Sequence, residues 1–293
     1  MARTHKPGIG GSNPPLATNS MNNILIFCLT LKPEHEKIIK KLSLIPVGLG
    51  KSNFSSNFFT DKTGDNIAQK NPFYGEYTFH YWIWKNYLNK INTDWVGFCQ
   101  YRKFFVKESI DKKNLNFEKL KKNLFIEVDS LNNDVGCVLG NRFSVENYKL
   151  SKILKNHLFH FLSKPSLFMN KKKRNLKLHF DLFHGKGNLD LAINLLDKNN
   201  RNDFKNFMNK QKSFNPHNMF LCRKELLEEY YSVIFPWLEK CEKIFKFENL
   251  NGYGLQRIYG FLAERFLSYW FTKNSNHVEM PIIVKDLSDY KDL

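Results

Sequence analysis

The sequence predicts an α/β fold in which a central, mostly parallel sheet is flanked by helices. Short apolar runs bounded by turn residues alternate along the chain with longer stretches of helical periodicity. Hydrophobic residues make up 42% of the 293 residues and aromatic residues 15%, as is typical of a packed globular protein. The clearest unit spans residues 65–105, where a loop, a helix, a buried strand and a basic turn follow one another. Ligands bind at the edge of open α/β sheets where parallel strands end, so this turn is the first candidate site.

In the N-terminal half, apolar runs predict strands and periodic stretches predict helices. The central helix is the best defined, because five large apolar side chains share one of its faces: Tyr77, Tyr81, Trp84, Leu88 and Ile91. The expected elements are strands at residues 24–31, 45–50 and 95–99, helices at 32–44 and 77–91, and a weak helix within 106–126. Residues 61–70 are predicted to form a polar loop.

The C-terminal half continues the alternation. The expected elements are strands at residues 134–139, 218–222 and 278–284 and helices at 144–161, 189–196, 204–208, 227–245 and 255–269. Pro236 predicts a kink in the longest helix. Pro281 favours an edge position for the last strand, since proline cannot donate a hydrogen bond to a neighbouring strand.

The first 20 residues differ in composition from the rest of the chain. Residues 1–20 are rich in Gly, Pro, Ser and Asn, and we expect them to be disordered. Their GGSNPPLAT stretch resembles a translated tRNA 3′ end, which makes Met21 a candidate start. Residues 21–293 are predicted to form a single domain, with a basic insertion or mobile loop at 163–180.

The net charge of +17 predicts an anionic partner, which is a nucleic acid, an anionic lipid surface or a phosphorylated substrate. The alternative is a lysine-rich coding bias without functional meaning. No RRM, KH, helix-turn-helix or zinc signature is present, and the aromatic residues follow helical core spacing, so nucleic-acid binding is the weaker interpretation. The KKKR run at residues 171–174 fits either peripheral contact with an anionic inner membrane or a solvated loop.

The sequence contains no run of 18 apolar residues and no signal-peptide pattern. Its five cysteines are scattered and form no C-x-x-C pair, which indicates buried free thiols in a reducing compartment rather than zinc ligands or disulfides. We therefore expect a cytoplasmic protein.

No Walker, G-x-G-x-x-G, H-E-x-x-H or G-x-S-x-G motif occurs, so candidate sites must be sought among clusters of polar residues. The first cluster surrounds Asp61, Asp65 and Asn66, which either contact a nucleotide sugar or form Asx turns. The second is Gln100-Tyr101-Arg102-Lys103, where Arg102 suits a phosphate group. Alternatively, these cations face water.

Three further clusters lie later in the chain. His184 and Asp190 are a possible acid or base pair, although a lone histidine is more often structural. His217 and Asn218 open the strand at 218–222 and are candidates for contacting a sugar hydroxyl. The adjacent Glu264 and Arg265 on an apolar helix indicate either a buried structural ion pair or a carboxylate that faces substrate.

The segments GDNIAQKNPFYGEYTFHYWIWKN and WVGFCQYRKFF, with the later NMFL and GFLAERF, together resemble the DUF4422 family of bacterial proteins regarded as glycosyltransferases. The resemblance spans about residues 24–271 in the family's order and spacing. It implies a GT-A-like, Rossmann-type fold and a hexosyltransferase that uses a nucleotide-diphosphate sugar of the UDP type. The implied acceptor is a capsule, lipopolysaccharide or other cell-surface glycan, which is free or lipid-linked.

The resemblance also implies roles for individual residues. The donor-binding positions that match the family's motifs are Asp61, Asp65, Asn66, Ile67, Lys85, Asn86, Gln100, Tyr101, Arg102 and Lys103. His184, His217, Asn218 and Arg265 are the candidates for acceptor or substrate contact, and Asp190 and Glu264 for the catalytic base.

Gln100 replaces the family's usual His, Lys103 replaces Arg, and Tyr77 replaces Leu. Because glutamine does not titrate, a proton-transfer role at position 100 is disfavoured.

GT-A enzymes typically carry an Asp-x-Asp motif that holds a divalent metal at the end of this strand, whereas this chain has Gln-Tyr-Arg-Lys. The hypothesis is that cations replace the metal. The alternative is that Asp61 or Asp65 recruits manganese or magnesium. A catalytically inactive protein that binds sugar nucleotides is the other interpretation of the missing motif.

Overall fold

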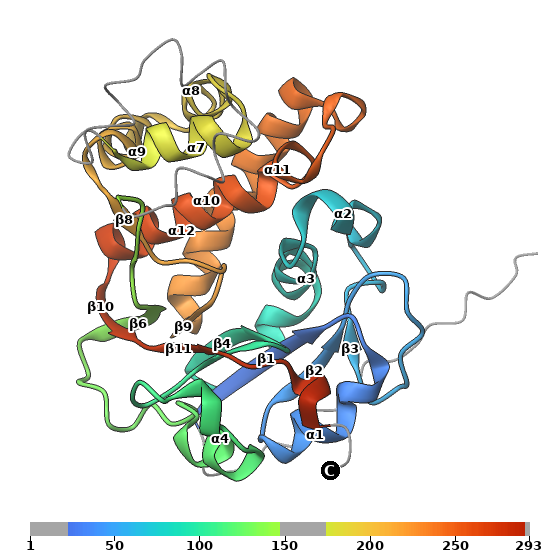
Figure 1. Cartoon of the computed structure of the whole chain (residues 1–293). Helices are drawn as coiled ribbons and strands as arrows, with labels where there is room; N and C mark the ends of the chain where they lie inside the picture. The colour runs from blue at the N-terminus through green and yellow to red at the C-terminus, as the bar shows by residue number, and fades with distance from the viewer. Residues whose placement is uncertain (1–22, 147–173, 291–293) are drawn as a thin grey trace, which may run out of the picture.

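The computed structural model describes residues 23–146 and 174–290, and within them an α/β fold with one large sheet (Figure 1). The main path of the sheet has the strand order β10-β6-β9-β4-β1-β2-β3. These strands are β1 (Ile24–Thr30), β2 (Ile45–Gly48), β3 (Phe59–Thr60), β4 (Trp95–Gln100), β6 (Val135–Gly140), β9 (Phe220–Arg223) and β10 (Asn276–Met280). All neighbours on this path are parallel except β9, which is antiparallel to both β4 and β6. The predicted fold class, with its central and largely parallel sheet, is confirmed.

Two short strands continue the sheet beside the carboxyl end of β4. β5 (Lys103–Phe105) pairs with β4 and with β11 (Ile282–Val284), both antiparallel. A separate two-stranded sheet joins β7 (Phe143–Ser144) to β8 (Ser213–Phe214). The C-terminal part of the chain thus lies beside the turn that follows β4.

The sheet is buried on both faces, because alternate residues of each central strand enter different core clusters. Phe27, Phe98 and Phe220 lie on one face and belong to the larger cluster. Cys28 and Leu221 lie on the other face. A sheet covered on both sides explains why the sequences of its strands are continuously apolar instead of alternating with polar residues.

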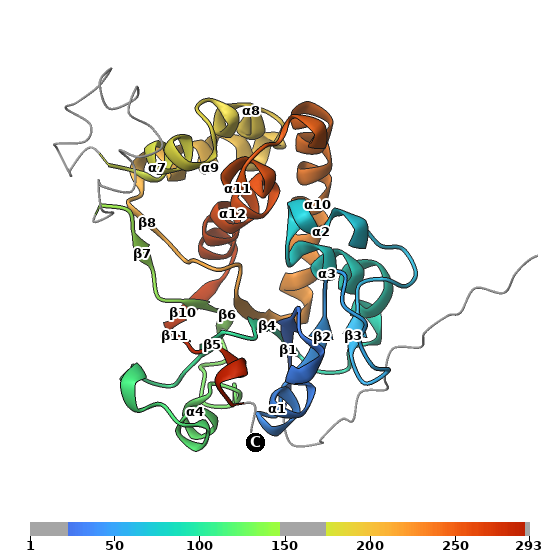
Figure 2. The ribbon, with the colours of Figure 1, turned by 45° about the vertical axis from the view of Figure 1, so that its right-hand side comes forward.

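Helices cover both faces (Figures 1 and 2). The larger core lies beneath α2 (Asn71–Tyr74), α3 (Tyr77–Trp82), α10 (Lys224–Phe245) and α12 (Ile258–Asn274). The opposite face packs against α1 (Glu36–Lys41) and α4 (Phe117–Asn123). An outer group consists of α7 (Leu176–His184), α8 (Asn188–Asn194) and α9 (Lys198–Lys210), and α11 (Tyr253–Gln256) precedes α12. Among the described residues, no helix is long and apolar enough to cross a membrane.

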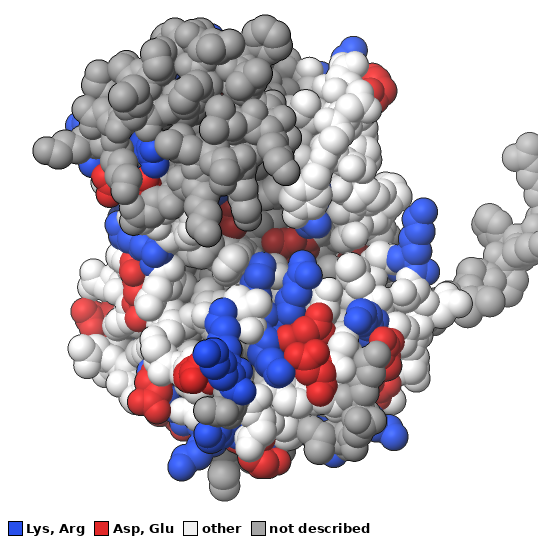
Figure 3. Space-filling view, viewed as in Figure 1, with Lys and Arg blue, Asp and Glu red and all other residues white. Residues whose placement is uncertain are grey.

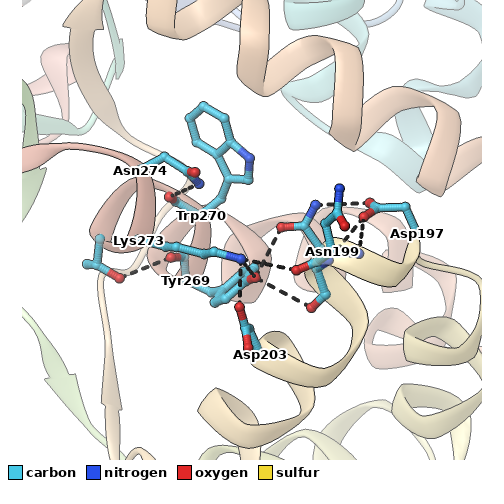
Figure 4. A network of polar contacts seen from close by, with 9 residues as sticks. Asp197, Asn199, Asp203, Tyr269, Trp270, Lys273 and Asn274 are labelled. Carbon is cyan, nitrogen blue, oxygen red and sulfur yellow. Dashed lines mark hydrogen bonds and ion pairs between the residues drawn. The ribbon is translucent and has the colours of Figure 1, made fainter.

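A polar network fastens α9 to α12 (Figure 4). Lys273 donates to Asp203 Oδ2 at 2.6 Å and to the backbone oxygen of Asn199 at 3.1 Å. The Tyr269 hydroxyl donates to Asn200 Oδ1 at 3.1 Å, and Asn200 is held by Asp197 at the start of α9. These contacts fix the outer helices to α12, whose N-terminal half reaches the sheet edge.

The central helix differs from the regular helix predicted at residues 77–91. After α3 the hydrogen bonding changes to a π-helical turn at Ile83–Tyr87 and then to a 3-10 turn at Leu88–Lys90. Tyr81 and Trp84 are only half-buried and pack on Phe235, with ring centroids 5.3 and 5.4 Å apart. Because the helix is enclosed on several sides, the predicted stripe is only part of its buried surface.

Other predicted boundaries change for local reasons. Within the predicted loop at 163–180, helix α7 begins at Leu176, since Asn175 Oδ1 accepts the backbone N–H of Leu178 at 2.8 Å as an N-cap. The predicted strand at 278–284 is two strands, β10 and β11, which are separated by Pro281. Residues 1–20, most of the predicted helix at 144–161 and the KKKR run up to residue 173 lie outside the described residues.

Buried neutral histidines link this core to pH. His80 lies above Phe98, with ring centroids 4.1 Å apart, and its Nδ1 is 2.7 Å from the Tyr231 hydroxyl. Burial lowers the pKa of His80 to about 3. An unfolded histidine has a pKa of about 6.5. Below that pH the His80 side chain therefore binds a proton in the unfolded state but stays neutral in the folded state. Stability therefore falls as the pH drops from about 6.5 towards 3, by about 1.4 kcal/mol per pH unit for each such histidine.

We predict that His80→Gln makes unfolding less sensitive to acid. The free energy of unfolding should be measured in urea at several pH values between 6.0 and 5.0. Its pH dependence gives the number of protons taken up on unfolding, which should be smaller by roughly one in the variant than in the wild-type protein. An unchanged pH slope would contradict a neutral, buried His80.

Candidate active site

A cavity of about 290 Å³ lies between the carboxyl ends of the strands and the N-terminal half of α12. Its floor comes from the ends of β1 and β2 and from the turn after β4, and its roof from α11 and α12. The lining residues that matter below are Asn71, Glu76, Gln100, Tyr101, Arg102, Lys103, His217, Asn218, Tyr253, Arg257, Phe261 and Glu264. Figure 3 shows a hollow across the middle of this face, with acidic atoms deep inside it and basic side chains along its lower margin.

The reversed direction of β9 brings two distant segments together. Phe98 pairs with Phe220, so the residues that precede β9 arrive beside the end of β4. Gln100 Nε2 donates to the backbone oxygen of His217 at 3.0 Å. His217 and Asn218 both have left-handed backbone angles, with φ of 81° and 52°. Consecutive non-glycine residues in this region are uncommon and are often found at functional sites.

The strained pair holds two carboxylates in place. Asn218 Nδ2 donates to Glu76 Oε1 at 2.9 Å and to the backbone oxygen of Gly260 at 3.2 Å. The backbone N–H of His217 donates to Glu264 Oε1 at 2.6 Å. Both carboxylates line the cavity, so this pair fixes its acidic groups.

Each carboxylate also binds an arginine. Arg257 Nη2 lies 3.3 Å from Glu76 Oε2. Arg265 is buried, with a relative exposure of 2%, and donates to Glu264 Oε2. Its guanidinium carbon lies 3.7 Å from the ring centroid of Phe214. Arg265 therefore supports Glu264 from behind and does not itself line the cavity.

Among the described residues, three cations line the cavity, namely Arg102, Lys103 and Arg257. Burial lowers the pKa of Lys103, and the nearby Arg102 and Arg257 lower it further, against the opposing effect of the glutamates. A depressed lysine pKa means that local negative charge does not balance the buried cation. An anionic ligand would supply the missing charge.

His217 contributes a neutral imidazole to the cavity. Burial, with Lys103 and Arg102, lowers the pKa of His217 to about 4 in spite of Glu264. At neutral pH the ring therefore has one nitrogen that can donate and one that can accept a hydrogen bond.

The C-terminal segment holds the basic turn from outside. The backbone N–H groups of Lys285 and Leu287 donate to the carbonyl oxygens of Arg102 and Tyr101, each at 3.1 Å. Ser288 Oγ is 2.9 Å from Nε2 of the buried His35, whose ring lies 5.2 Å from that of Tyr101. The turn after β4 is thus fixed by β1, β5 and this segment.

The loop predicted to bind the donor lies outside the cavity lining. Asp65 and Asn86 hold each other, since Asn86 Nδ2 donates to the Asp65 backbone oxygen at 2.7 Å and Asn86 Oδ1 accepts the Asp65 N–H at 3.0 Å. Asn66 Oδ1 accepts the N–H of Ala68 as an Asx turn. Lys85 is exposed and lies 3.6 Å above the ring centroid of Trp84.

Asp61 and Ile67 also fall outside the lining. Asp61 is buried at the end of β3, where burial raises the pKa of its carboxyl. Ile67 is half-buried and packs against the larger core cluster. In this structure the contacts of residues 61–67 are those of a loop held against the central helix.

His184 and Asp190 do not line the cavity either. Asp190 lies on α8 and accepts from Lys177 Nζ at 2.5 Å. His184 is buried, its Nδ1 is 3.0 Å from the Gly254 backbone oxygen, and its ring stacks on Phe261 with centroids 4.0 Å apart. Of the two predicted catalytic carboxylates, the structure brings only Glu264 to the cavity.

Sequence reasoning did not assign Glu76, Arg257 or Tyr253 to the site. Glu76 directly follows Gly75 at the start of the central helix, and this position was the available signal. Tyr253 precedes the predicted helix at 255–269 and Arg257 lies near its start, and the Arg257–Glu76 contact spans 181 residues. No local pattern predicts a contact of that kind.

The donor set of the cavity does not fit a metal ion held by the protein. Glu76 and Glu264 each already bind an arginine. In the described part of the chain, no three His, Cys, Asp or Glu side chains converge as metal ligands do.

The Glu264–Arg265 pair predicts a large stability effect. Replacing Glu264 by Gln leaves the Arg265 guanidinium buried without a counter-charge, which costs about 3 kcal/mol. Urea unfolding of Glu264→Gln should show this loss. The double variant Glu264→Gln/Arg265→Met should recover part of it, because it buries no unpaired charge. A single variant within about 0.5 kcal/mol of wild type would contradict a buried, paired Arg265.

Comparisons with known proteins found two solved structures to report. The structure of WbbM, a bifunctional glycosyltransferase, matches with a TM-score of 0.63 at 22% identity and covers 90% of this chain. The match takes up 45% of that protein, so this chain spans less than half of its length. The S. cerevisiae mannosyltransferase Ktr4p aligns over 89% of this chain and 70% of its own, with a TM-score of 0.34 and 10% identity. No curated protein matches.

A family model described as "Domain of unknown function (DUF4422)" matches residues 26–275, which is most of the chain. The match confirms the resemblance found in the central helix, the strand and turn after it, and the two later motifs. The chain belongs to the DUF4422 family.

Proposed function

We propose that this protein is a glycosyltransferase that uses a nucleotide-diphosphate sugar. The proposal rests chiefly on the cavity at the carboxyl edge of the sheet, where three cations meet two fixed carboxylates. Such an arrangement suits a donor that carries a diphosphate together with an acceptor that reacts through a hydroxyl. The fold shared with a protein named as a bifunctional glycosyltransferase supports the same reaction class.

The cationic side chains suit the diphosphate. Arg102 and Lys103 extend from the turn after β4, and Arg257 reaches the cavity from the roof. In sugar transfer the bond between the anomeric carbon and the diphosphate oxygen breaks, and negative charge grows on the leaving diphosphate. Fixed cations near that oxygen stabilise the transition state more than the ground state.

Glu264 is the proposed catalytic base. A hydroxyl of the acceptor gives its proton to the Glu264 carboxylate while its oxygen bonds to the anomeric carbon. The electron pair of the broken bond leaves with the nucleoside diphosphate. The N–H of His217 and the guanidinium of Arg265 orient the carboxylate for this role. Asp190 lies on α8 outside the cavity, so the proposal rests on Glu264.

The finer assignments follow the family resemblance. The donor is proposed to be a UDP-sugar, and the acceptor a growing capsule, lipopolysaccharide or related glycan, free or lipid-linked. A cytoplasmic protein with a net charge of +17 suits work against the anionic inner leaflet. The competing proposal is a protein that binds sugar nucleotides without transferring the sugar.

A binding experiment tests the cationic site. Lys103→Ala should weaken UDP binding by about tenfold or more, because it removes one charge-assisted phosphate contact of about 1.5–3 kcal/mol. Lys107→Ala is the matched control, since Lys107 is an exposed lysine outside the cavity lining. Isothermal titration of both variants measures the difference. Equal affinity for UDP in Lys103→Ala and Lys107→Ala would refute a diphosphate site at this turn.

Metal removal tests whether the cations suffice. We expect sugar transfer, or hydrolysis of the donor in the absence of an acceptor, to persist in excess EDTA. The physical reason is that Arg102, Lys103 and Arg257 supply the positive charge that a divalent ion supplies elsewhere. Complete loss of turnover in EDTA with recovery on adding manganese would show that this part of the account is wrong. Donor binding without any turnover in either condition would favour the inactive binding protein.

A further inference from the structure

The roof of the cavity carries an aromatic surface that the reaction described above does not use. Tyr253 is 69% exposed, the most exposed of the large hydrophobic side chains in the described residues, and it lines the cavity. Its ring packs edge-on against Phe261, with centroids 5.9 Å apart and an interplanar angle of 71°. Phe261 also lines the cavity. An exposed tyrosine at the mouth of a polar cavity leaves one aromatic face available to a ligand.

This surface is held rigidly from behind. Phe261 stacks on the buried ring of His184, with centroids 4.0 Å apart. His184 is fixed in turn by its contact with the backbone oxygen of Gly254, the residue after Tyr253. A Cβ atom at position 254 would lie 2.2 Å from the carbonyl oxygen of Phe183, so only glycine allows α11 to rest so closely on α7. The backbone beside Tyr253 is therefore anchored although its side chain is exposed.

The position of the aromatic surface relative to Glu264 indicates what it binds. Phe261 and Glu264 are three residues apart on α12, so they lie on the same helix face, and both line the cavity. A ligand that covers the aromatic rings thus lies next to the carboxylate. A pyranose ring has the matching chemistry, because its C–H face packs on an aromatic ring while its hydroxyls point outward from the rim.

We infer that Tyr253 and Phe261 form the acceptor subsite, which takes a pyranose ring stacked on Tyr253 and directs one of its hydroxyls to Glu264. This inference rests on the proposed transferase function and adds the residues that hold the acceptor sugar. Arg102 and Lys103 on the floor remain for the diphosphate. The guanidinium carbon of Arg257 lies 5.9 Å from the centroid of the Tyr253 ring, so Arg257 stands between the two proposed subsites.

Saturation-transfer difference NMR tests the subsite without a known acceptor. The probes are methyl pyranosides of glucose, galactose, mannose and N-acetylglucosamine, each with the full-length protein and saturating UDP. At least one probe should receive saturation mainly on the C–H protons of one ring face. Tyr253→Ala should weaken that probe's binding by roughly five- to tenfold, the size of one aromatic stacking contact. Tyr253→Phe should retain it.

Ile244→Ala is the matched control, because Ile244 is 51% exposed on α10 and does not line the cavity. It should leave pyranoside binding unchanged. No saturation of any pyranoside in the wild-type protein, or equal saturation in Tyr253→Ala, would overturn the inference. A loss of UDP affinity in Tyr253→Ala would also overturn it, since the surface would then hold the nucleobase.

The two proposals fail in different ways. If UDP does not bind the wild-type protein but a pyranoside binds in a Tyr253-dependent manner, the transferase proposal fails and the sugar subsite stands. If UDP binds in a Lys103-dependent manner and no pyranoside depends on Tyr253, the donor site stands and the acceptor subsite fails.

Discussion

The candidate site depends on one constraint, which is the reversed strand β9 between β4 and β6. If β9 ran parallel to its neighbours, its N-terminal end would lie at the opposite edge of the sheet. Because it is antiparallel, His217 and Asn218 arrive beside Gln100, and Gln100 donates to His217. The left-handed backbone of these two residues then directs one donor to Glu76 and another to Glu264. Helix α12 and the residue before it add Arg257, Glu264 and Arg265, so four segments distant in sequence share a single network of charges. Among the described residues, the three cations that line the cavity outnumber its two lining carboxylates.

The fold and the core of the site were predictable wherever the signal is local. Apolar runs predicted the strands β1, β4 and β9 to within about two residues, because strands buried on both faces have continuous hydrophobic sequences. Gln100–Lys103 was a candidate site because it follows the end of β4, and ligands bind α/β sheets at the edge where parallel strands end. Glu264 was recognised because a charge on an apolar helix requires a partner, and Arg265 is that partner. The resemblance to the DUF4422 family added the order of the motifs, which composition alone does not provide.

The sequence did not predict the positions of side chains that depend on contacts with distant parts of the chain. Asp65, Asn66 and Asn86 have the composition of a ligand loop. In this structure Asp65 and Asn86 bind each other and Asn66 binds the backbone of its own loop, and no sequence pattern distinguishes these outcomes. Asp190 is similar, because its partner Lys177 comes from another helix. The partners of Arg257 and of the C-terminal segment that holds the basic turn lie 181 or more residues away in the chain, and the helical pattern around Arg257 does not indicate them. The π-helical turn after α3 interrupts a pattern that reads as one regular helix. In each case tertiary packing, and not local preference, fixes the side chain.

The most direct test of the account is a crystal structure of the protein soaked with UDP, or with UDP-glucose if UDP does not bind within the soaking time. The account predicts that the diphosphate lies in the cavity beneath α12, with its oxygens within hydrogen-bond distance of Arg102, Lys103 or Arg257. It also predicts that Glu264 keeps its contact with the N–H of His217. A diphosphate bound against the loop of Asp65 and Asn66 with the cavity empty would contradict the account. So would an absence of any bound nucleotide at millimolar concentration in crystals whose cavity is open to solvent.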